Sequence, residues 1–396
     1  MFSLLITHLK QIVQIVDDDV TEFLKGPDMS SFKILTSESA TLCILVDAEG
    51  KIVYVGNEAG FDDVIGDQEV VEKLDGNGGI ALPGFVDAHS HPVFAGDRVH
   101  EFAMKLAGAT YMEVQKAGGG IMFTTRKTRE ASRQELEKDF GEIAEKMLRS
   151  GTTTLEAKSG YGLDTKTEVK MLEVLSNVST KLEVSATFCG AHAVPEGTTE
   201  DNQTEVIVNE TIPKLVELKK NGLLHNLENI DVFCEKGVFE ILSSRTEIGA
   251  TAMSHLEEIS DEGVDQMAKK GTVAVLLPST AFILRLTPPP ARRMIDNGVI
   301  VALGSDFNPN AYCYAMPMIM HFACITMKLS MKETLVAATL NSAHSIGRGR
   351  THGAIAVGRI GDIVLLEAES WEHIIYRVAA HQDIIRHVIK KGVIIH

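Results

Sequence analysis

The sequence predicts an α/β protein in which parallel strands and helices alternate in a (β/α) barrel, with a small β-domain built from both termini. Short apolar strands alternate with helical patterns through the middle of the chain, whereas both ends carry short strands and turns. A chain of 396 residues, 44% of them hydrophobic, is long enough for a barrel and an accessory domain. We expect residues 1–80 and 351–396 to form a small β-sandwich and residues 81–350 to form the barrel.

Short strands separated by turn residues occupy both ends of the chain. The N-terminal part contains a strand-turn-strand pattern, in which Asp47-Ala48-Glu49-Gly50-Lys51 separates two apolar runs. We expect strands here at 3–6, 12–16, 42–46 and 52–55, and further strands near the C-terminus within 361–366 and 388–395.

The middle of the chain has one strand fewer than a closed barrel of the common type. We expect strands at 81–87, 152–157, 183–189, 229–233, 250–255, 272–276 and 299–303. We expect helices at 134–149, 165–175, 206–221, 261–269, 289–296 and 332–340. A closed barrel has eight strands, and the interval between Asp231 and His255 has room for only one short connection. The sequence therefore predicts a barrel that lacks one βα unit at this point.

Two histidines, His89 and His91, follow the first predicted barrel strand. Alternate side chains of a strand share a face, so both imidazoles can hold one metal ion. A metal ion there lowers the pKa of a bound water to about 7 and makes a hydroxide nucleophile, which is hydrolase chemistry. The ordinary interpretation of an isolated His-x-His pair is a surface or core element, so the downstream residues decide between the two.

Polar clusters follow the other predicted strands, at the end where a barrel assembles its active site. Asp306, by itself a typical turn or capping residue, follows the last strand, which lies beside the first in a barrel. It is therefore a candidate third ligand for zinc or iron, and a candidate general base.

Four further residues are candidates for substrate contacts. His192 and His255 follow strands and can polarise a carbonyl, although single histidines are more often buried structural residues. Arg98 can bind a substrate carboxylate, unless it is a solvated surface residue. Tyr161 lies between two glycines, on a mobile loop or in a plain turn.

The composition excludes several classes of partner. The formal net charge of −16 repels nucleic acid and anionic membranes, so an anionic substrate needs local Arg or Lys. No run reaches the roughly 18 to 20 apolar residues that cross a bilayer. Five scattered cysteines without a disulfide framework, together with a start that lacks a cleavage site, predict a cytoplasmic protein.

These motifs resemble the amidohydrolase superfamily, and within it the imidazolonepropionases of histidine degradation. Phe85-Val86-Asp87-Ala88-His89-Ser90-His91 is similar to the superfamily's first-strand metal motif. The runs from Val93 to Arg98, from Lys158 to Leu163 and from Ala274 to Pro278 resemble imidazolonepropionases in particular. The resemblance implies an amidohydrolase-type (β/α)8 barrel that hydrolyses 4-imidazolone-5-propanoate to N-formimidoyl-L-glutamate with one zinc or iron ion, in a homodimer.

The resemblance also assigns residues. His89, His91 and Asp306 match metal ligands, and His255 matches a histidine near the attacked carbonyl. The positions that match substrate-binding residues, including those for the propionate group, are Arg98, Tyr111, Tyr161, His192 and Asn308.

One family motif is missing. The resemblance implies a His-x-Asp-Glu type motif after the fifth strand, which supplies a third imidazole ligand and a glutamate for the activated water. The chain passes from Phe233 to His255 without it, at the interval where the strand count falls short. The sequence leaves two other interpretations open: a non-catalytic, shortened variant of this enzyme, and another amidohydrolase such as a deaminase or a cyclic-imide hydrolase.

Overall fold

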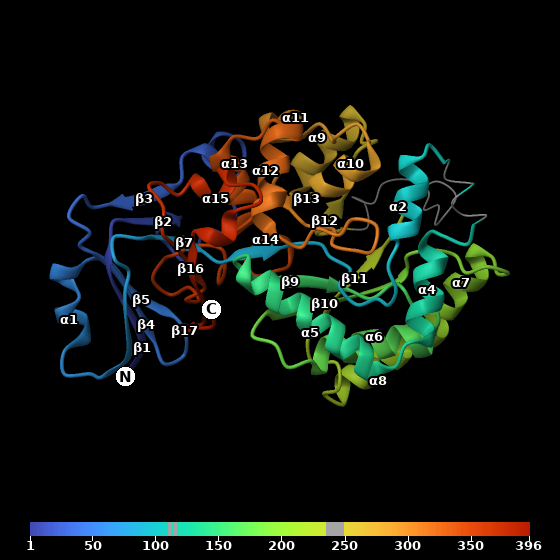
Figure 1. Cartoon of the computed structure of the whole chain (residues 1–396), viewed down its shortest axis with the longest axis horizontal. Coiled ribbons are helices and arrows are strands. Elements are labelled where there is room, and N and C mark those ends of the chain that lie inside the picture. Colours follow the sequence, from blue (N-terminus) through green and yellow to red (C-terminus); the bar gives the residue numbers. More distant parts are fainter. Residues whose placement is uncertain (110–112, 114–116, 235–248) are drawn as a thin grey trace.

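The computed structural model describes residues 1–109, 113, 117–234 and 249–396. Figure 1 shows two parts: β-sheets that contain both ends of the chain, and a larger part in which helices surround parallel strands. Tyr111 lies outside the described residues, as does most of the interval in which the sequence lacks a strand.

Two sheets make up the part that contains the termini. The first has the order β5-β4-β1-β6, with β1 antiparallel to β4 and parallel to β6. Its strands are β1 (Phe2–Leu9), β4 (Leu42–Asp47), β5 (Ile52–Asn57) and β6 (Val70–Asp75). The second has the order β17-β16-β15-β7-β2-β3. Its strands are β2 (Gln11–Ile15), β3 (Lys33–Thr36), β7 (Ile80–Pro83), β15 (Ile363–Leu366), β16 (Ile385–Lys390) and β17 (Val393–Ile394).

The two terminal sheets share one hydrophobic core. Leu4 and Ile44 of the first sheet lie in the same fully buried cluster as Ile12, Ile363 and Ile389 of the second. Burial of such side chains is the main favourable contribution to folding. The N-terminal and C-terminal segments are therefore packed into one unit. The terminal segments of the chain also contain the short helices η1 (Gly26–Ser30), η2 (Glu58–Gly60), α1 (Asp62–Ile65), α15 (His373–Tyr376) and η4 (His381–Asp383).

The first predicted barrel strand, 81–87, is divided in the structure. β7 pairs with β15 and β2 of the terminal sheet, whereas β8 (Phe85–Asp87) pairs with β9. Gly84 lies between them, and its N–H donates to the carbonyl of Asp362. A Cβ atom at position 84 would lie 2.3 Å from Thr153 Oγ1. The absence of a side chain at Gly84 thus lets the chain pass closely from one sheet to the next.

Seven parallel strands in the described residues form two further sheets, of orders β11-β10-β9-β8 and β12-β13-β14. The bounds of the other strands are β9 (Thr152–Lys158), β10 (Glu183–Ala191), β11 (Leu227–Val232), β12 (Ala252–Ser254), β13 (Val273–Leu276) and β14 (Val301–Leu303). All seven fall where the sequence predicts them. Parallel strands covered by helices are typical of a (β/α) barrel.

The two parallel sheets meet at one side and are separate at the other. Just beyond β8 and β14, Asp306 N–H donates to the His89 carbonyl and His91 N–H donates to the Phe307 carbonyl, both at 2.8 Å. Within the described ranges, no strand pairing joins β11 to β12. The strand order is therefore continuous from β11 through β8 and β14 to β12, and interrupted between β11 and β12.

The exposure of β11 differs from that of the strands in the middle of its sheet. Every residue of β9 is buried, whereas Ile230 and Val232 of β11 are 64% and 40% exposed. Strands of parallel sheets are ordinarily buried on both faces. The side of β11 next to the interruption is therefore uncovered in the part of the chain that the structure describes.

Helices cover the parallel strands on the outside (Figure 1). Those after β8, β9 and β10 are α2 (Val99–Leu106), α4 (Ile121–Glu130), α5 (Arg133–Arg149), α6 (Thr165–Asn177), α7 (Glu200–Val206), a π-helical turn η3 (Ile207–Thr211) and α8 (Ile212–Lys220). Those after β12, β13 and β14 are α9 (Asp261–Lys270), α10 (Pro278–Leu284), α11 (Ala291–Asp296), α12 (Met316–Met327), α13 (Met331–Ala337) and α14 (Leu340–Ser345).

The helices differ from the sequence expectation in their bounds and in their number. The predicted helix 206–221 begins earlier, at α7, and the predicted helix 332–340 ends at Ala337 as α13, with α14 beginning at Leu340. The expectation did not include α2, α4, α10 or α12; the segment of α12 is apolar on nearly every side and lacks a periodic polar face. Among the helices within the described ranges, none has the length and apolarity to cross a bilayer.

A buried ionic network joins the terminal sheets to the parallel strands. Lys390 of β16 lies 2.6 Å from Asp362 Oδ2 and 3.0 Å from Glu183 Oε2, at the start of β10. Burial raises the pKa of Glu183, but His352 and Lys390 outweigh burial and hold this pKa below its ordinary value of 4.5. Glu183 is therefore ionised in the folded protein.

We expect Gly84→Ala to lower the free energy of unfolding by about 1–3 kcal/mol, because the new methyl group meets Thr153 in a packed interior. Gly141→Ala in α5 is the matched control. Its Cβ would lie 3.7 Å from Val178, an ordinary contact, and alanine favours a helix interior by about 1 kcal/mol. Urea denaturation checks both changes, and equal stability of Gly84→Ala and the wild type would contradict the close approach at this position.

We expect Lys390→Met to destabilise the protein by about 3–5 kcal/mol, because it removes the cation 2.6 Å from buried Asp362 and one of the cations around Glu183, which keeps Arg348 and Lys391. Lys391→Met, beside it but 52% exposed and 3.1 Å from the same Glu183 Oε2, is expected to cost about 0–1 kcal/mol.

This network also predicts a dependence on pH. Because its folded pKa is depressed, Glu183 contributes stability above pH 4.5 that is lost as the pH falls. Lys390→Met removes part of that contribution, so its stability falls less steeply with acid. Parallel acid dependences of variant and wild type, measured by urea denaturation, would refute this role of Lys390.

Candidate metal centre

The contact between β8 and β14 brings three predicted site residues together. His89 Nε2 lies 3.6 Å from Asp306 Oδ1, and His91 Nε2 lies 3.7 Å from the same oxygen. All three residues are buried. The two strand ends thus direct two imidazoles toward one carboxylate oxygen.

His255 joins this cluster from the end of β12. In the described part of the chain, the group of possible ligands whose atoms all lie within 4.8 Å of one another consists of His89, His255 and Asp306. The rings of His89 and His255 are 5.9 Å apart, edge to face. His91 reaches Asp306 from the other side, with its ring 5.4 Å from that of His89.

The chemistry of this donor set fits a divalent ion. Distances of 3.6 and 3.7 Å exceed those of hydrogen bonds but lie near the separation of about 3.3 Å between two ligands of one tetrahedral zinc ion. Burial, together with nearby Lys158 and the neighbouring histidines, lowers the pKa of His89 and of His91 well below 6.5. Both imidazoles are therefore neutral, as metal ligands must be.

The backbone and neighbouring hydroxyls fix the carboxylate of Asp306. Its backbone has a φ of +46°, and its Oδ2 accepts a 2.5 Å hydrogen bond from Thr280 Oγ1. Burial raises the pKa of Asp306, although His255, Thr280, Asn308 and Lys158 oppose this shift. A non-glycine residue with this φ is uncommon and is held by its surroundings at a functional site.

A second carboxylate holds β8 and β14 together behind the site. Asp87 accepts hydrogen bonds from the Ser305 N–H at 2.8 Å and from Ser305 Oγ at 2.5 Å. Burial raises the pKa of Asp87 to about 7, against the effect of these hydrogen bonds. Asp87, two residues before His89, thus holds Ser305, the residue before Asp306, in a fixed position.

A buried charge cluster beside the site was not assigned a role from the sequence. Lys158 Nζ lies 2.8 Å from Glu156 Oε1 and 3.0 Å from Asp231 Oδ2. Burial by itself lowers the pKa of Lys158, but the carboxylates of Asp231 and Glu156 outweigh burial and raise this pKa above its ordinary value of 10.5. Lys158 therefore stays charged. Glu156 also accepts a hydrogen bond from Thr187. The sequence of β9, Thr-Thr-Thr-Leu-Glu-Ala-Lys, is mostly polar, so only the burial of the whole strand reveals that its two charged residues require partners.

Tyr161 and His192 line the side of the site next to His91. The His192 ring stacks on His91 at 4.7 Å, and the Tyr161 ring lies 5.3 Å from that of His192. His192 Nδ1 bonds to the carbonyl of Gly160 at 2.9 Å, and burial lowers the pKa of His192 to about 4. Neutral His192 therefore carries its proton on Nδ1, which leaves Nε2 as an acceptor.

Glu168 anchors the loop that carries Tyr161. Its carboxylate accepts hydrogen bonds from the N–H groups of Gly160, Gly162 and Leu163 at 2.7–3.0 Å. No sequence pattern indicates this role, because Glu168 lies in the first turn of an ordinary amphipathic helix. The loop is therefore fixed by a buried carboxylate, although a mobile loop was one of the sequence expectations.

Arg98 lies at the start of α2 and is already engaged. Its Nε and Nη2 donate to the two carboxylate oxygens of Glu101 at 2.8 and 2.9 Å. Lys105 binds the same carboxylate at 2.6 Å and donates to Asn310 at 2.8 Å. Arg98 is thus held in place by Glu101 rather than solvated. The group formed by Arg98, Lys105 and Glu101 has a net charge of +1.

Asn308 orders its own loop. It donates to the Asp306 carbonyl at 2.7 Å and accepts from the N–H groups of Asn310 and Ala311. The side-chain amide of Asn308 therefore stabilises the turn that follows Asp306. The sequence resemblance assigns this residue to the substrate alone.

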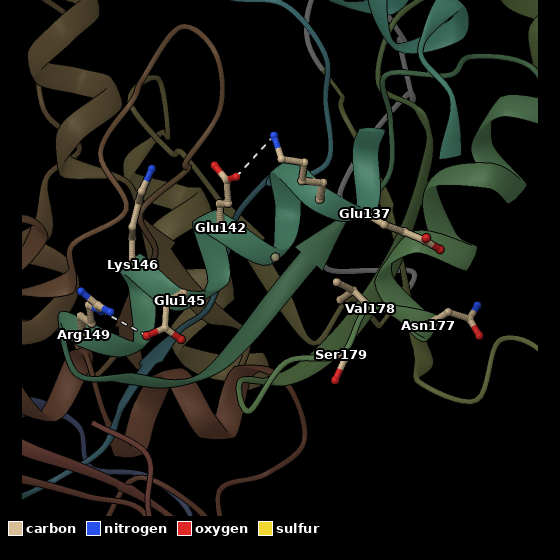
Figure 2. A pocket seen from close by; sticks show the side chains of 10 residues that line it. Glu137, Glu142, Glu145, Lys146, Arg149, Asn177, Val178 and Ser179 are labelled. Atoms are coloured by element: carbon tan, nitrogen blue, oxygen red, sulfur yellow. Dashed lines mark hydrogen bonds and ion pairs between the residues drawn. The ribbon is translucent and has the colours of Figure 1, made fainter. Parts of the chain in front are cut away.

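A surface groove of about 780 Å³ lies away from these residues (Figure 2). It runs along the outer face of α5, where charged pairs such as Lys138 and Glu142 line it, and reaches Asn177 and Ser179. Asn177 is the last residue of α6 and Ser179 lies between α6 and β10, at the end of the strands opposite the metal centre. The groove is therefore no part of the candidate site.

Comparisons with known proteins agree on the family. A sequence profile described as "Amidohydrolase family" matches residues 219–395. A protein of Nematostella vectensis named "Probable imidazolonepropionase" is 46% identical and covers 100% of this chain and 99% of its own. One of Danio rerio with the same name is 48% identical, over 99% of this chain and 96% of its own.

The first of these alignments also shows a shortfall. It spans 427 positions, whereas this chain has 396 residues, so at least 31 aligned positions have no residue here.

Solved structures of low identity share the fold. A triazine hydrolase variant has a TM-score of 0.70 at 16% identity, covering 99% of this chain and 94% of that one. An atrazine chlorohydrolase from Arthrobacter aurescens, complexed with zinc, has a TM-score of 0.67 at 16% identity with the same coverage. The Nematostella vectensis and Danio rerio proteins are 46% and 48% identical to this chain over nearly the whole length of both chains. This protein therefore belongs to the imidazolonepropionase family of the amidohydrolases.

Proposed function

We propose that this chain hydrolyses 4-imidazolone-5-propanoate to N-formimidoyl-L-glutamate in histidine degradation. The observation that carries the proposal is the convergence of His89, His91 and Asp306 in a chain whose relatives bear the name imidazolonepropionase. These three residues would hold one divalent ion, zinc or iron, since imidazole and carboxylate ligands suit both.

When bound, the ion supplies Lewis-acid activation of the water that attacks the ring carbonyl. Asp306 accepts the proton of this water on its carboxylate, whose orientation Thr280 fixes. The carbon–nitrogen bond of the ring then breaks, and Asp306 returns the proton to the departing nitrogen. The raised pKa of Asp306 suits a group that must accept and release a proton.

His192 orients the ring of the substrate. Its Nδ1 is bound to the Gly160 carbonyl, so its Nε2 accepts a hydrogen bond from a ring N–H rather than donating one to the carbonyl. The low pKa of His192 keeps it neutral, so it does not transfer protons at neutral pH.

Arg98 and Tyr161 bind the propionate carboxylate. Glu101 occupies Nε and Nη2 of Arg98, which leaves its Nη1 for the substrate. Burial raises the pKa of Tyr161, so its phenol stays protonated and donates a hydrogen bond. We further propose that Tyr111 and Asn308 border the same pocket, as the resemblance implies.

We also propose the remaining organisation from the sequence. The terminal sheets form a β-sandwich domain of residues 1–80 and 351–396, and residues 81–350 form a barrel that lacks one βα unit between β11 and β12. The uncovered Ile230 and Val232 and the 31 unmatched positions support this. We expect a homodimer in the cytoplasm, which fits five cysteines that form no disulfide.

The same observations favour a second candidate, a non-catalytic variant of this enzyme. Among the described residues no strand pairs with the outer side of β11, which leaves strand groups there without partners, and an unmatched unit removes side chains from one side of the site. Turnover distinguishes the two candidates.

We expect purified protein reconstituted with zinc or iron to consume imidazolone propionate, followed by loss of its ultraviolet absorbance. Asp306→Asn is expected to lower the rate by at least about 10²–10⁴-fold, because it removes the proton carrier. Turnover no faster than that of the metal alone would contradict the proposal and favour the non-catalytic variant.

We expect Arg98→Met to raise KM about 10- to 100-fold with a smaller change in kcat, because a charge-assisted hydrogen bond contributes about 1.5–3 kcal/mol. Lys105→Met, which loses a contact to the same Glu101, is the control and should change KM less. Steady-state kinetics check both variants. Equal effects would show that Arg98 acts only through Glu101.

A further inference from the structure

The compact donor group differs from the metal set expected from the sequence. The sequence assigns His89, His91 and Asp306 to the ion and His255 to the substrate. In the described residues, however, the group with every ligand atom within 4.8 Å of the others contains His255 with His89 and Asp306.

The backbone holds His255 against His89. Ser254, the last residue of β12, bonds through Oγ to His89 Nδ1 at 2.8 Å. This leaves His89 Nε2 directed toward Asp306 and brings the next residue of β12, His255, to the same place. His255 and Leu256 have φ values of +69° and +75°, two successive left-handed residues other than glycine. Such strain is maintained where surrounding contacts require a particular side-chain position.

A partly buried carboxylate lies beside His255. Glu257 Oε2 lies 3.7 Å from His255 Nδ1, and Glu257 Oε1 is buried without a hydrogen bond in the described part of the molecule. Metal-binding histidines commonly have a carboxylate behind the ring, which orients the imidazole and increases its basicity. The Glu257 and His255 pair has the composition of such an arrangement.

We propose that His255 is a direct ligand of the ion, so that three imidazoles, His89, His91 and His255, and the Asp306 carboxylate bind it together. The inference rests on the proposed metal centre and changes the role of His255 from a substrate contact to a ligand. His192 is then the imidazole that remains for the substrate. The ion ties β12, the edge strand next to the interruption, to β8 and β14.

The test measures metal binding and does not depend on turnover. Wild-type protein, His255→Gln and His192→Gln are loaded with Co²⁺ or Zn²⁺ and dialysed against a metal buffer, and bound metal is measured by elemental analysis. Partners behind a ligand change metal affinity by about 10- to 100-fold, so loss of a direct ligand should weaken binding by at least about 100-fold in His255→Gln. His192→Gln should bind one ion as the wild type does, and the visible Co²⁺ spectrum should change only in His255→Gln.

Two results would overturn the proposal: unchanged affinity and Co²⁺ spectrum in His255→Gln, or absence of bound metal in the wild type. X-ray absorption of the zinc-loaded wild type requires no variant and covers the case in which His255→Gln fails to fold. Three imidazole ligands support the proposal and two contradict it. None of these readouts requires turnover. If the protein is inactive but its metal binding depends on His255, the proposed function is wrong and the assignment of His255 as a metal ligand still stands.

Discussion

The pairing of the residues just beyond β8 and β14 is the constraint on which the rest of the site depends. Two backbone hydrogen bonds, from Asp306 to His89 and from His91 to Phe307, join the first and last parallel strands. Asp87 reinforces them by binding Ser305 through two hydrogen bonds. Because side chains alternate along an extended chain, this register directs His89 and His91 toward Asp306. A slip of one residue would direct them away from it.

A layer of charged and polar groups supports this pairing. Lys158 joins Glu156 of β9 to Asp231 of β11, and Glu168 fixes the loop that carries Tyr161. Unpaired buried charges are costly, so each group limits the positions that its partners can adopt. The strands on the β8 side of the interruption are therefore linked through buried ion pairs as well as through their ladder hydrogen bonds. On the other side, β12 is linked to β8 through Ser254 and His89.

Much of this arrangement could be predicted from the sequence. All seven parallel strands lie at the expected places, because their apolar runs are short and bounded by polar clusters. The convergence of His89, His91 and Asp306 follows from the closure of a barrel between its first and last strands. The division at Gly84 could not be predicted, since it depends on the approach of Thr153 from a distant strand. The partners of Arg98 and the anchor Glu168 depend likewise on tertiary contacts, and α12 lacks the periodicity that reveals a helix.

The central claim is that side chains just beyond the ends of β8, β12 and β14 bind one divalent ion. Anomalous diffraction from crystals of the zinc-loaded protein, recorded at the zinc absorption edge, tests it most directly. The account predicts a single strong peak about 2.0–2.2 Å from ligand atoms of His89, His91, His255 and Asp306. A peak elsewhere, or none among these four side chains at full loading, would contradict it.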